Sequence, residues 1–82
     1  MRYITIPFCW LDEENNVLRT DLRINPFSID SFHASILDFI DPVERIPLSQ
    51  DITTITTRSG LTYEIMLRVA EFEALINGFM AQ

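Results

Sequence analysis

Two residues of this chain have side chains that are common in nucleophilic catalysis, and each type occurs once: Cys9 is the only cysteine and His33 the only histidine. A cysteine and a histidine within hydrogen-bond reach can form an activated thiolate nucleophile. Nothing in their spacing brings these two together, and a lone cysteine in a strand usually behaves as a small hydrophobic residue. We therefore expect both to have structural roles, and a small hydrolase using Cys9 is the least favoured function.

Acidic residues are concentrated in two segments that could bind a cation. The first runs from Asp12 to Asn16 and begins like a calcium loop, but an EF-hand loop needs glycine at its sixth position and glutamate at its twelfth. Counted from Asp12, those positions hold Val17 and Arg23. The second segment could also supply an acid–base pair, and its members are Asp38, Asp41, Glu44 and Asp51. No histidine or glycine pattern accompanies either segment, so both are expected to be solvated turns or loops.

A lone glycine, Gly60, is not a phosphate-cradling loop. The sequence thus predicts no catalytic residue, no metal ligand and no cofactor, and we do not expect an enzyme.

The charge balance makes nucleic acid an unlikely direct ligand class. Twelve acidic residues stand against six basic ones, giving a net charge of −6, and every basic residue is an arginine. Phosphate contacts by basic side chains supply most of the affinity for DNA and RNA, so direct nucleic-acid binding is disfavoured. The same charge suits an alternative function, that of an acidic inhibitor which imitates nucleic acid and blocks a basic groove of another protein.

Length and composition indicate one globular domain over residues 1–82. The hydrophobic fraction of 48% is too high for a disordered chain. One cysteine excludes an internal disulfide and a multi-cysteine zinc site. No apolar run is long enough for a signal peptide or a membrane span, so we expect no membrane association and, by elimination, a cytoplasmic location.

The first 26 residues have the pattern of two strands joined by a polar turn. The segment from Arg2 to Trp10 alternates, and apolar side chains fall on both of its faces. Pro7 cannot donate a ladder hydrogen bond, which places this strand at an edge of the sheet or at a bulge. After the turn at 12–16, a second strand runs from Val17 to Ile24 and is ended by Asn25-Pro26.

The middle of the chain fits two interpretations. Phe32, Ile36, Phe39 and Ile40 are spaced as on a helix with Ser31 as N-cap, whereas Ile29–Ile36 also fits a third strand, which we favour. An irregular connection is expected over residues 41–50, since it contains two prolines.

The second half predicts a hairpin and a helix. A threonine-rich strand from Ile52 to Arg58 meets a turn at Ser59-Gly60, and strict alternation follows from Leu61 to Arg68. From Val69 the period changes to about 3.6, and Gly78 is expected to end the helix. The apolar stripe of this helix consists of Val69, Phe72, Leu75, Ile76, Phe79 and Met80. The fold class that follows is α+β: an antiparallel sheet of four or five strands with a C-terminal helix packed on one face.

With these segments placed, the chain resembles small bacterial and phage proteins of the FlbD/SwrD type, which act in flagellar and swarming motility. The residues that carry the resemblance lie in 24–29 and 52–80: Ile24-Asn25-Pro26, Ser28-Ile29, Thr53-Thr54-Ile55-Thr56, Ser59-Gly60, Tyr63-Glu64-Ile65 and Val69-x-Glu71-Phe72. The N-terminal strand and a long insert at 37–51 depart from the pattern. The resemblance implies a non-enzymatic accessory role. The ending also resembles the LytTR DNA-binding domain, but the acidic charge argues against that family.

Nine aromatic residues are many for one face of so small a sheet to bury. Either some apolar surface remains for a partner, or the 27–51 segment folds over the second face and covers it. We expect a non-enzymatic interaction or accessory protein, of the kind that phages and mobile elements encode. We also expect it to form a homodimer through the N-terminal strand, because an apolar edge invites a second copy. The predicted partner-binding residues are Tyr3, Phe8, Trp10 and Phe39.

Overall fold

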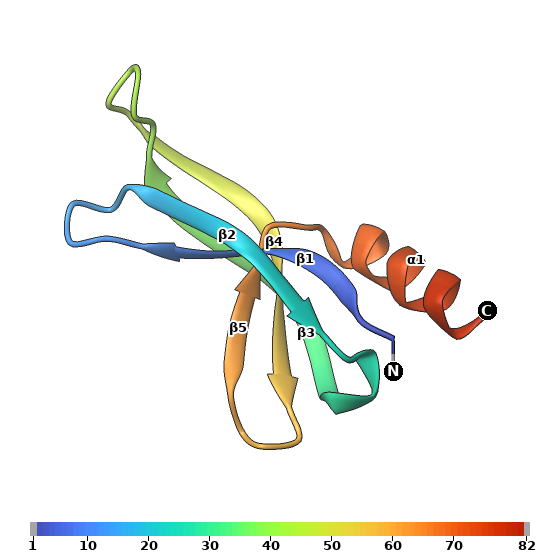
Figure 1. Cartoon of the computed structure of the whole chain (residues 1–82). Helices are drawn as coiled ribbons and strands as arrows, with labels where there is room; N and C mark the ends of the chain where they lie inside the picture. The colour runs from blue at the N-terminus through green and yellow to red at the C-terminus, as the bar shows by residue number, and fades with distance from the viewer. Residues whose placement is uncertain (1, 82) are drawn as a thin grey trace.

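The computed structural model describes residues 2–81 and shows a five-stranded antiparallel sheet with one C-terminal α-helix (Figure 1). This confirms the predicted α+β class. In chain order the elements are β1 (Ile4–Leu11), β2 (Val17–Ile24), a 3₁₀ turn η1 (Pro26–Ser28), β3 (Ile29–Ile40), β4 (Pro47–Thr57), β5 (Thr62–Ile65) and α1 (Val69–Met80).

The strand order is β2-β1-β5-β4-β3, which makes β2 and β3 the edges of the sheet. β1 pairs with β2 along its whole length, from Ile4 opposite Ile24 to Leu11 opposite Val17. On its other side, β1 pairs with β5. The prediction that the N-terminal strand lies at an edge is therefore wrong. The predicted dimer contact on that strand loses its basis in an exposed edge, and the dimer itself stays a prediction.

Pro7 is tolerated in this internal strand because its missing N–H points where no partner is needed. The carbonyl of Pro7 accepts a hydrogen bond from the Met66 N–H at 2.8 Å, just beyond the end of β5. The backbone N–H and C=O of one strand residue point the same way, so Pro7 turns both toward β5 and neither toward β2. Its pairing with Asp21 on β2 is thus a non-hydrogen-bonded pair, and the proline costs the β1–β2 ladder nothing.

β3 and β4 form one long hairpin. The favoured strand interpretation of the middle segment is confirmed, and the strand extends to Ile40. The irregular connection expected over residues 41–50 is wrong for its second part, because β4 begins at Pro47 and pairs with Ile40. Pro47 fits there because its partner Ile40 directs its own N–H away from β4, to the carbonyl of Asn15. The expected 37–51 insert is therefore the distal half of this hairpin.

Gly60 makes the turn between β4 and β5, as predicted. Its φ is +91°, and its N–H bonds the Thr57 carbonyl at 2.9 Å, while the Thr57 N–H bonds the Leu61 carbonyl. This is a three-residue loop with glycine in the left-handed position. β5 is shorter than the expected Leu61–Arg68 strand, because the Leu67 N–H turns back to the Ile65 carbonyl at 2.8 Å and leads the chain off the sheet.

α1 covers one end of one sheet face. Its first turn is closed by the Glu71 carboxylate, which accepts a hydrogen bond from the Arg68 N–H at 3.1 Å. Phe72 and Phe79 are buried, whereas Leu75 and Met80 of the predicted stripe remain 37% and 47% exposed. Gly78 does not end the helix, which continues to Met80. The main core, as we call the buried cluster at this end, consists of Ile4, Ile6, Ile24, Ile55, Ile65, Phe72 and Phe79.

A second core lies at the other end of the sheet. Its buried members are Cys9, Leu37 and Ile52, and the half-buried side chains around them are Leu11, Val17, Phe39 and Met66. It forms where the two long hairpins lie against each other, and their tips are joined by the bond from the Ile40 N–H to the Asn15 carbonyl at 3.0 Å. The alternative in which the 27–51 segment covers the second face of the N-terminal strand is thus confirmed for Cys9.

Candidate functional site

The four residues predicted to bind a partner lie in three different places. Phe8 and Trp10 lie on the same face of β1 as the main core, Tyr3 precedes β1 beside α1, and Phe39 is half-buried at the second core. Phe8 and Trp10 are in contact, with ring centroids 5.2 Å apart and planes at 28°. The structure therefore brings together half of the predicted set.

Phe8 and Trp10 belong to a larger exposed cluster, which we call the aromatic surface and define as Phe8, Trp10, Leu18 and Tyr63. Tyr63 of β5 meets the ring of Phe8 edge-on, with centroids 5.3 Å apart. Leu18 of β2 is the direct cross-strand neighbour of Trp10. Trp10 is 40% exposed and Leu18 is 41% exposed, whereas their neighbours Phe8 and Tyr63 are half-buried.

The aromatic surface exists because α1 packs over the other end of this face. Ile4, Ile6, Phe8 and Trp10 alternate along one face of β1, a distance of about 20 Å at 3.3 Å per residue. The twelve residues of α1 span about 18 Å and pack against the end that holds Ile4 and Ile6. Phe8 is partly buried at the margin of the main core, and Trp10 lies beyond that margin. Core-type side chains thus continue past the helix onto the surface.

Leu18 and Tyr63 were not among the predicted site residues, although the sequence held a signal for Leu18. The turn at 12–16 makes Leu11 opposite Val17, and counting outward from that pair places Leu18 against Trp10. Tyr63 could be assigned to this surface only from the pairing of β1 with β5. That pairing joins residues far apart in the sequence, such as Cys9 and Glu64, which are 55 positions apart. No local pattern predicts a pairing of that range.

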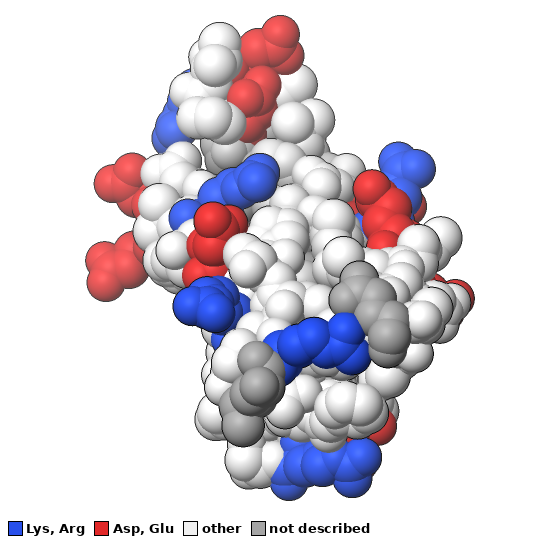
Figure 2. All heavy atoms as spheres, turned by 45° about the vertical axis from the view of Figure 1, so that its right-hand side comes forward, with Lys and Arg blue, Asp and Glu red and all other residues white. Residues whose placement is uncertain are grey.

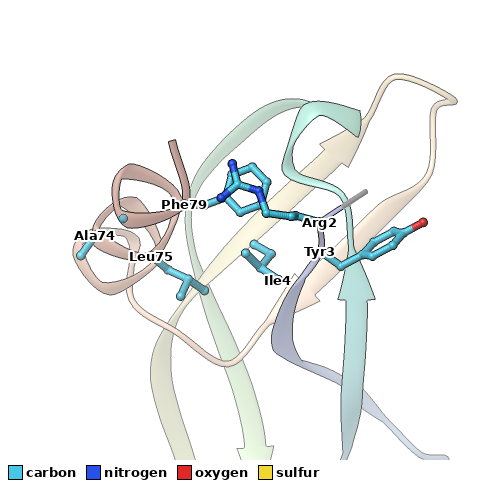
Figure 3. A pocket seen from close by; sticks show the side chains of 7 residues that line it. Arg2, Tyr3, Ile4, Ala74, Leu75 and Phe79 are labelled. Carbon is cyan, nitrogen blue, oxygen red and sulfur yellow. The ribbon is translucent and has the colours of Figure 1, made fainter. Parts of the chain in front are cut away.

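Tyr3 lies near a separate groove between the start of β1 and α1, with a volume of about 400 Å³ (Figure 3). In this view Arg2 reaches toward the helix, with its guanidinium carbon 4.9 Å from the centroid of the Phe79 ring, and Tyr3 turns away from the helix. Tyr3 instead lies beneath the guanidinium of Arg23, at 5.4 Å. The groove is lined by apolar helix residues and Ile4, and Arg2 already covers one of its walls.

Cys9 and His33 share one row across the sheet but lie far apart. The row runs Arg19–Cys9–Glu64–Thr54–His33, one residue from each strand. Three strand spacings of about 4.8 Å separate Cys9 from His33, about 14 Å in total, so the two cannot form a nucleophile pair. Between them, the Thr54 hydroxyl donates to the Glu64 carboxylate at 2.8 Å.

The environment of the Cys9 thiol also makes it unreactive as a nucleophile. Burial raises the pKa of Cys9 above its ordinary value, the Glu64 carboxylate raises it further, and Arg19 lowers it in part. The side chain has no exposed surface. A buried, protonated thiol is a poor nucleophile, which supports the structural role predicted for Cys9.

The acidic segments build turns. The Asp12 carboxylate accepts hydrogen bonds from the N–H groups of Glu14 and Asn16, at 2.8 and 2.9 Å. Asp41 does the same at the other hairpin tip, where its two carboxylate oxygens accept from Val43 and Glu44 at 3.2 and 3.4 Å. The bonds from Asn16 and Glu14 lower the pKa of Asp12, with a small contribution from Arg45. Among residues 2–81, no group of three or more His, Cys, Asp and Glu side chains is placed to hold a metal ion.

The charged groups on the face drawn in Figure 2 are scattered over a mostly uncharged surface. Acidic and basic side chains lie next to one another there, on either side of an uncharged area in the middle of the face. No helix within residues 2–81 is long and apolar enough to cross a membrane.

Comparison of the chain with protein-family models, curated proteins and solved structures finds no match. The resemblance to proteins of the FlbD/SwrD type therefore stays a prediction.

Proposed function

We propose that the chain is a non-enzymatic interaction module that binds another protein through the aromatic surface. The observation that carries the proposal is the pair formed by Trp10 and Leu18, both about 40% exposed beside the half-buried Phe8 and Tyr63. Aromatic residues are enriched in the centres of protein interfaces, where tryptophan and tyrosine supply much of the binding energy. A cluster that continues the core without a cover of its own is suited to this use.

The rigidity of the aromatic surface supports the proposal. Phe8 is fixed by the edge-on contact with Tyr63, and Trp10 stacks on Phe8, so the exposed indole is held in place before a partner arrives. A side chain ordered in advance loses little conformational freedom on binding, which improves affinity. The partner we expect is a protein with an apolar side chain or a short apolar ridge at its contact.

The alternative of an acidic inhibitor is less well supported by the geometry. On the face drawn in Figure 2, the acidic side chains are interspersed with basic ones and do not form one continuous acidic patch. The hydrolase alternative has no support from Cys9, which is buried and about 14 Å from His33 by strand spacing. The two binding functions are separated by salt: an apolar contact tolerates it, whereas binding of acidic groups to a basic groove weakens with ionic strength.

The test compares Trp10→Asp with Leu75→Asp. Leu75 is 37% exposed, close to the value for Trp10, but it lies on α1 away from the aromatic surface. A protein captured by the wild-type chain from its native lysate is purified and titrated onto each variant. Binding should weaken at least tenfold for Trp10→Asp and stay within twofold for Leu75→Asp.

Trp10 is the only tryptophan, so its fluorescence reports directly on the contact. The emission should shift to the blue when the purified partner binds, and the affinity should change little between low and high salt. Binding that is lost in salt and unaffected by Trp10→Asp would favour the acidic inhibitor. Loss with Leu75→Asp alone would contradict the proposal.

A further inference from the structure

The outer edge of β2 carries alternating basic and acidic side chains, so the same edge of a second copy can offer opposite charges to it. Because Pro7 turns its backbone groups toward β5, its non-hydrogen-bonded partner Asp21 directs its own N–H and C=O away from β1. The same holds for every second residue, so Arg19, Asp21 and Arg23 present backbone donors and acceptors at the edge. All three side chains are exposed.

We infer that the chain forms a two-fold dimer in which β2 pairs antiparallel with β2 of a second copy, with Thr20 opposite Thr20 of that copy. In this register Arg19 lies directly opposite the second copy's Asp21, and by symmetry Asp21 lies opposite the second copy's Arg19. Two pairs of opposite charge form on one face of the joined sheet, and cross-strand pairs of this kind stabilise strand pairing. On the other face, Leu18 lies opposite the second copy's Leu22.

The charge pattern selects this register from its neighbours. A shift that centres the pair on Asp21 sets Asp21 against its own copy and Arg19 against Arg23, which places like charges together throughout. Centring on Arg19 sets two arginines against each other. Centring on Leu22 pairs Asp21 with Arg23 but overlaps only residues 20–24, whereas the Thr20 register overlaps residues 17–23 of the strand Val17–Ile24. The Thr20 register therefore combines opposite charges with nearly the full length of β2.

The other edge of the sheet does not offer the same match. The acidic residues of β3 are Asp30 and Asp38, and β3 contains no arginine to oppose them. Its far end is also occupied, since the Ile40 N–H is bonded to Asn15. The net charge of −6 on each copy opposes dimerisation, but that repulsion is spread over the surface and is screened within about 8 Å at physiological salt. Locally the β2 edge carries two arginines and one aspartate.

This inference goes beyond the proposed function. The two surfaces share Leu18, but the edge of β2 is tested at Arg19, Asp21 and Thr20, whereas the aromatic surface is tested at Trp10. The first experiment measures self-association by light scattering and sedimentation equilibrium at tens of micromolar. The wild type should be a dimer. Arg19→Asp should weaken the association about tenfold, because it turns two attractive pairs into repulsive ones. Adding Asp21→Arg to the same chain should restore it.

Arg23→Asp is the matched control, since Arg23 lies opposite Val17 in the Thr20 register and should change the association little. If Arg23→Asp dissociates the dimer and Arg19→Asp does not, the register is wrong.

The second experiment traps the two-fold axis. A non-hydrogen-bonded antiparallel pair has Cα atoms about 4.5 Å apart, within the range of a disulfide. Thr20→Cys should therefore form a disulfide-linked dimer under mild oxidation, whereas Leu22→Cys should not, and the buried Cys9 can stay in place. A wild-type monomer over this concentration range, or cross-linking through Leu22→Cys instead of Thr20→Cys, would overturn the inference. Circular dichroism confirms that each variant is folded.

Discussion

The two ends of the sheet are stabilised by different means. At the α1 end, a helix lays two phenylalanines over strand residues, and Phe72 meets the ring of Phe32 with centroids 5.0 Å apart. At the hairpin end, two hairpins cover each other around Cys9, Leu37 and Ile52, without a contribution from α1. Successive residues of β1 serve both ends, since Phe8 faces the main core and Cys9 faces the second. One strand with apolar groups on both faces therefore joins two cores of unequal size.

The inequality predicts that the fold depends most on the α1 end. Phe72 is fully buried in the main core, and Phe72→Ala should lower the free energy of unfolding by about 3–5 kcal/mol. Urea denaturation followed by circular dichroism measures the loss. The control is Leu75→Ala on the same helix, which is 37% exposed and should cost less than about 1 kcal/mol. A Phe72→Ala variant as stable as the control would mean that the helix does not stabilise the fold.

The second core should respond less to a comparable truncation. Leu37 is 8% exposed and has fewer buried neighbours, so Leu37→Ala should cost about 2 kcal/mol, near the low end for a core leucine. Its chain neighbour Ile36 is 65% exposed on the opposite face, and Ile36→Ala should leave the denaturation midpoint almost unchanged. If Leu37→Ala cost as much as Phe72→Ala, the two cores would be equal partners, and the comparison above would fail.

A smaller effect than either core truncation is expected from the turn between β4 and β5. Gly60, in the turn between β4 and β5, has a φ of +91°, and a Cβ placed there would meet nothing within 4 Å. Backbone strain alone should therefore make Gly60→Val cost more than about 1 kcal/mol, since a β-branched residue is poorly tolerated at positive φ. Gly60→Asn should cost less, because asparagine adopts this conformation more readily. Equal midpoints for the two variants would show that the turn can change its conformation.

Local patterns were sufficient to predict most of the elements. Alternation and β-branched residues placed the strands, and the change of period at Val69 placed the helix. The prediction failed where a distant contact decides. Pro7 was taken as a mark of an edge strand, yet its carbonyl bonds Met66, 59 positions later in the chain, and β1 is internal. The failure at Gly78 has a local cause, because a single glycine within a helical pattern is tolerated and helical residues continue to Met80.

The candidate site was predictable only in part, for the same reason. Phe8 and Trp10 lie two residues apart on one strand, and alternation alone puts them on the same face. Tyr63 joins them through the pairing of β1 with β5, and Phe39 leaves the set because the β3–β4 hairpin carries it to the second core. Local alternation thus identifies which side chains share a face, whereas strand order determines which faces meet.

The smallest expected effect concerns the two hairpin tips, where Asp12 and Asp41 have equivalent roles. The carboxylate of Asp12 accepts its two backbone bonds at 2.8 and 2.9 Å, and that of Asp41 accepts at 3.2 and 3.4 Å. Because these bonds favour the charged form, the pKa of Asp12 is lowered in the folded state from its ordinary value of 3.8. The stabilisation is therefore present above pH 3.8, where the unfolded chain is also ionised. It is lost as the pH falls from there through the lowered pKa.

Asp12→Asn removes the charge and keeps an oxygen acceptor, so its denaturation midpoint should lie below that of the wild type at pH 6. The two midpoints should converge as the pH falls below about 4. Asp41→Asn, with its longer bonds, should show a smaller difference at pH 6. A gap between wild type and Asp12→Asn that stays constant from pH 6 to pH 2.5 would show that the Asp12 charge does not hold the turn.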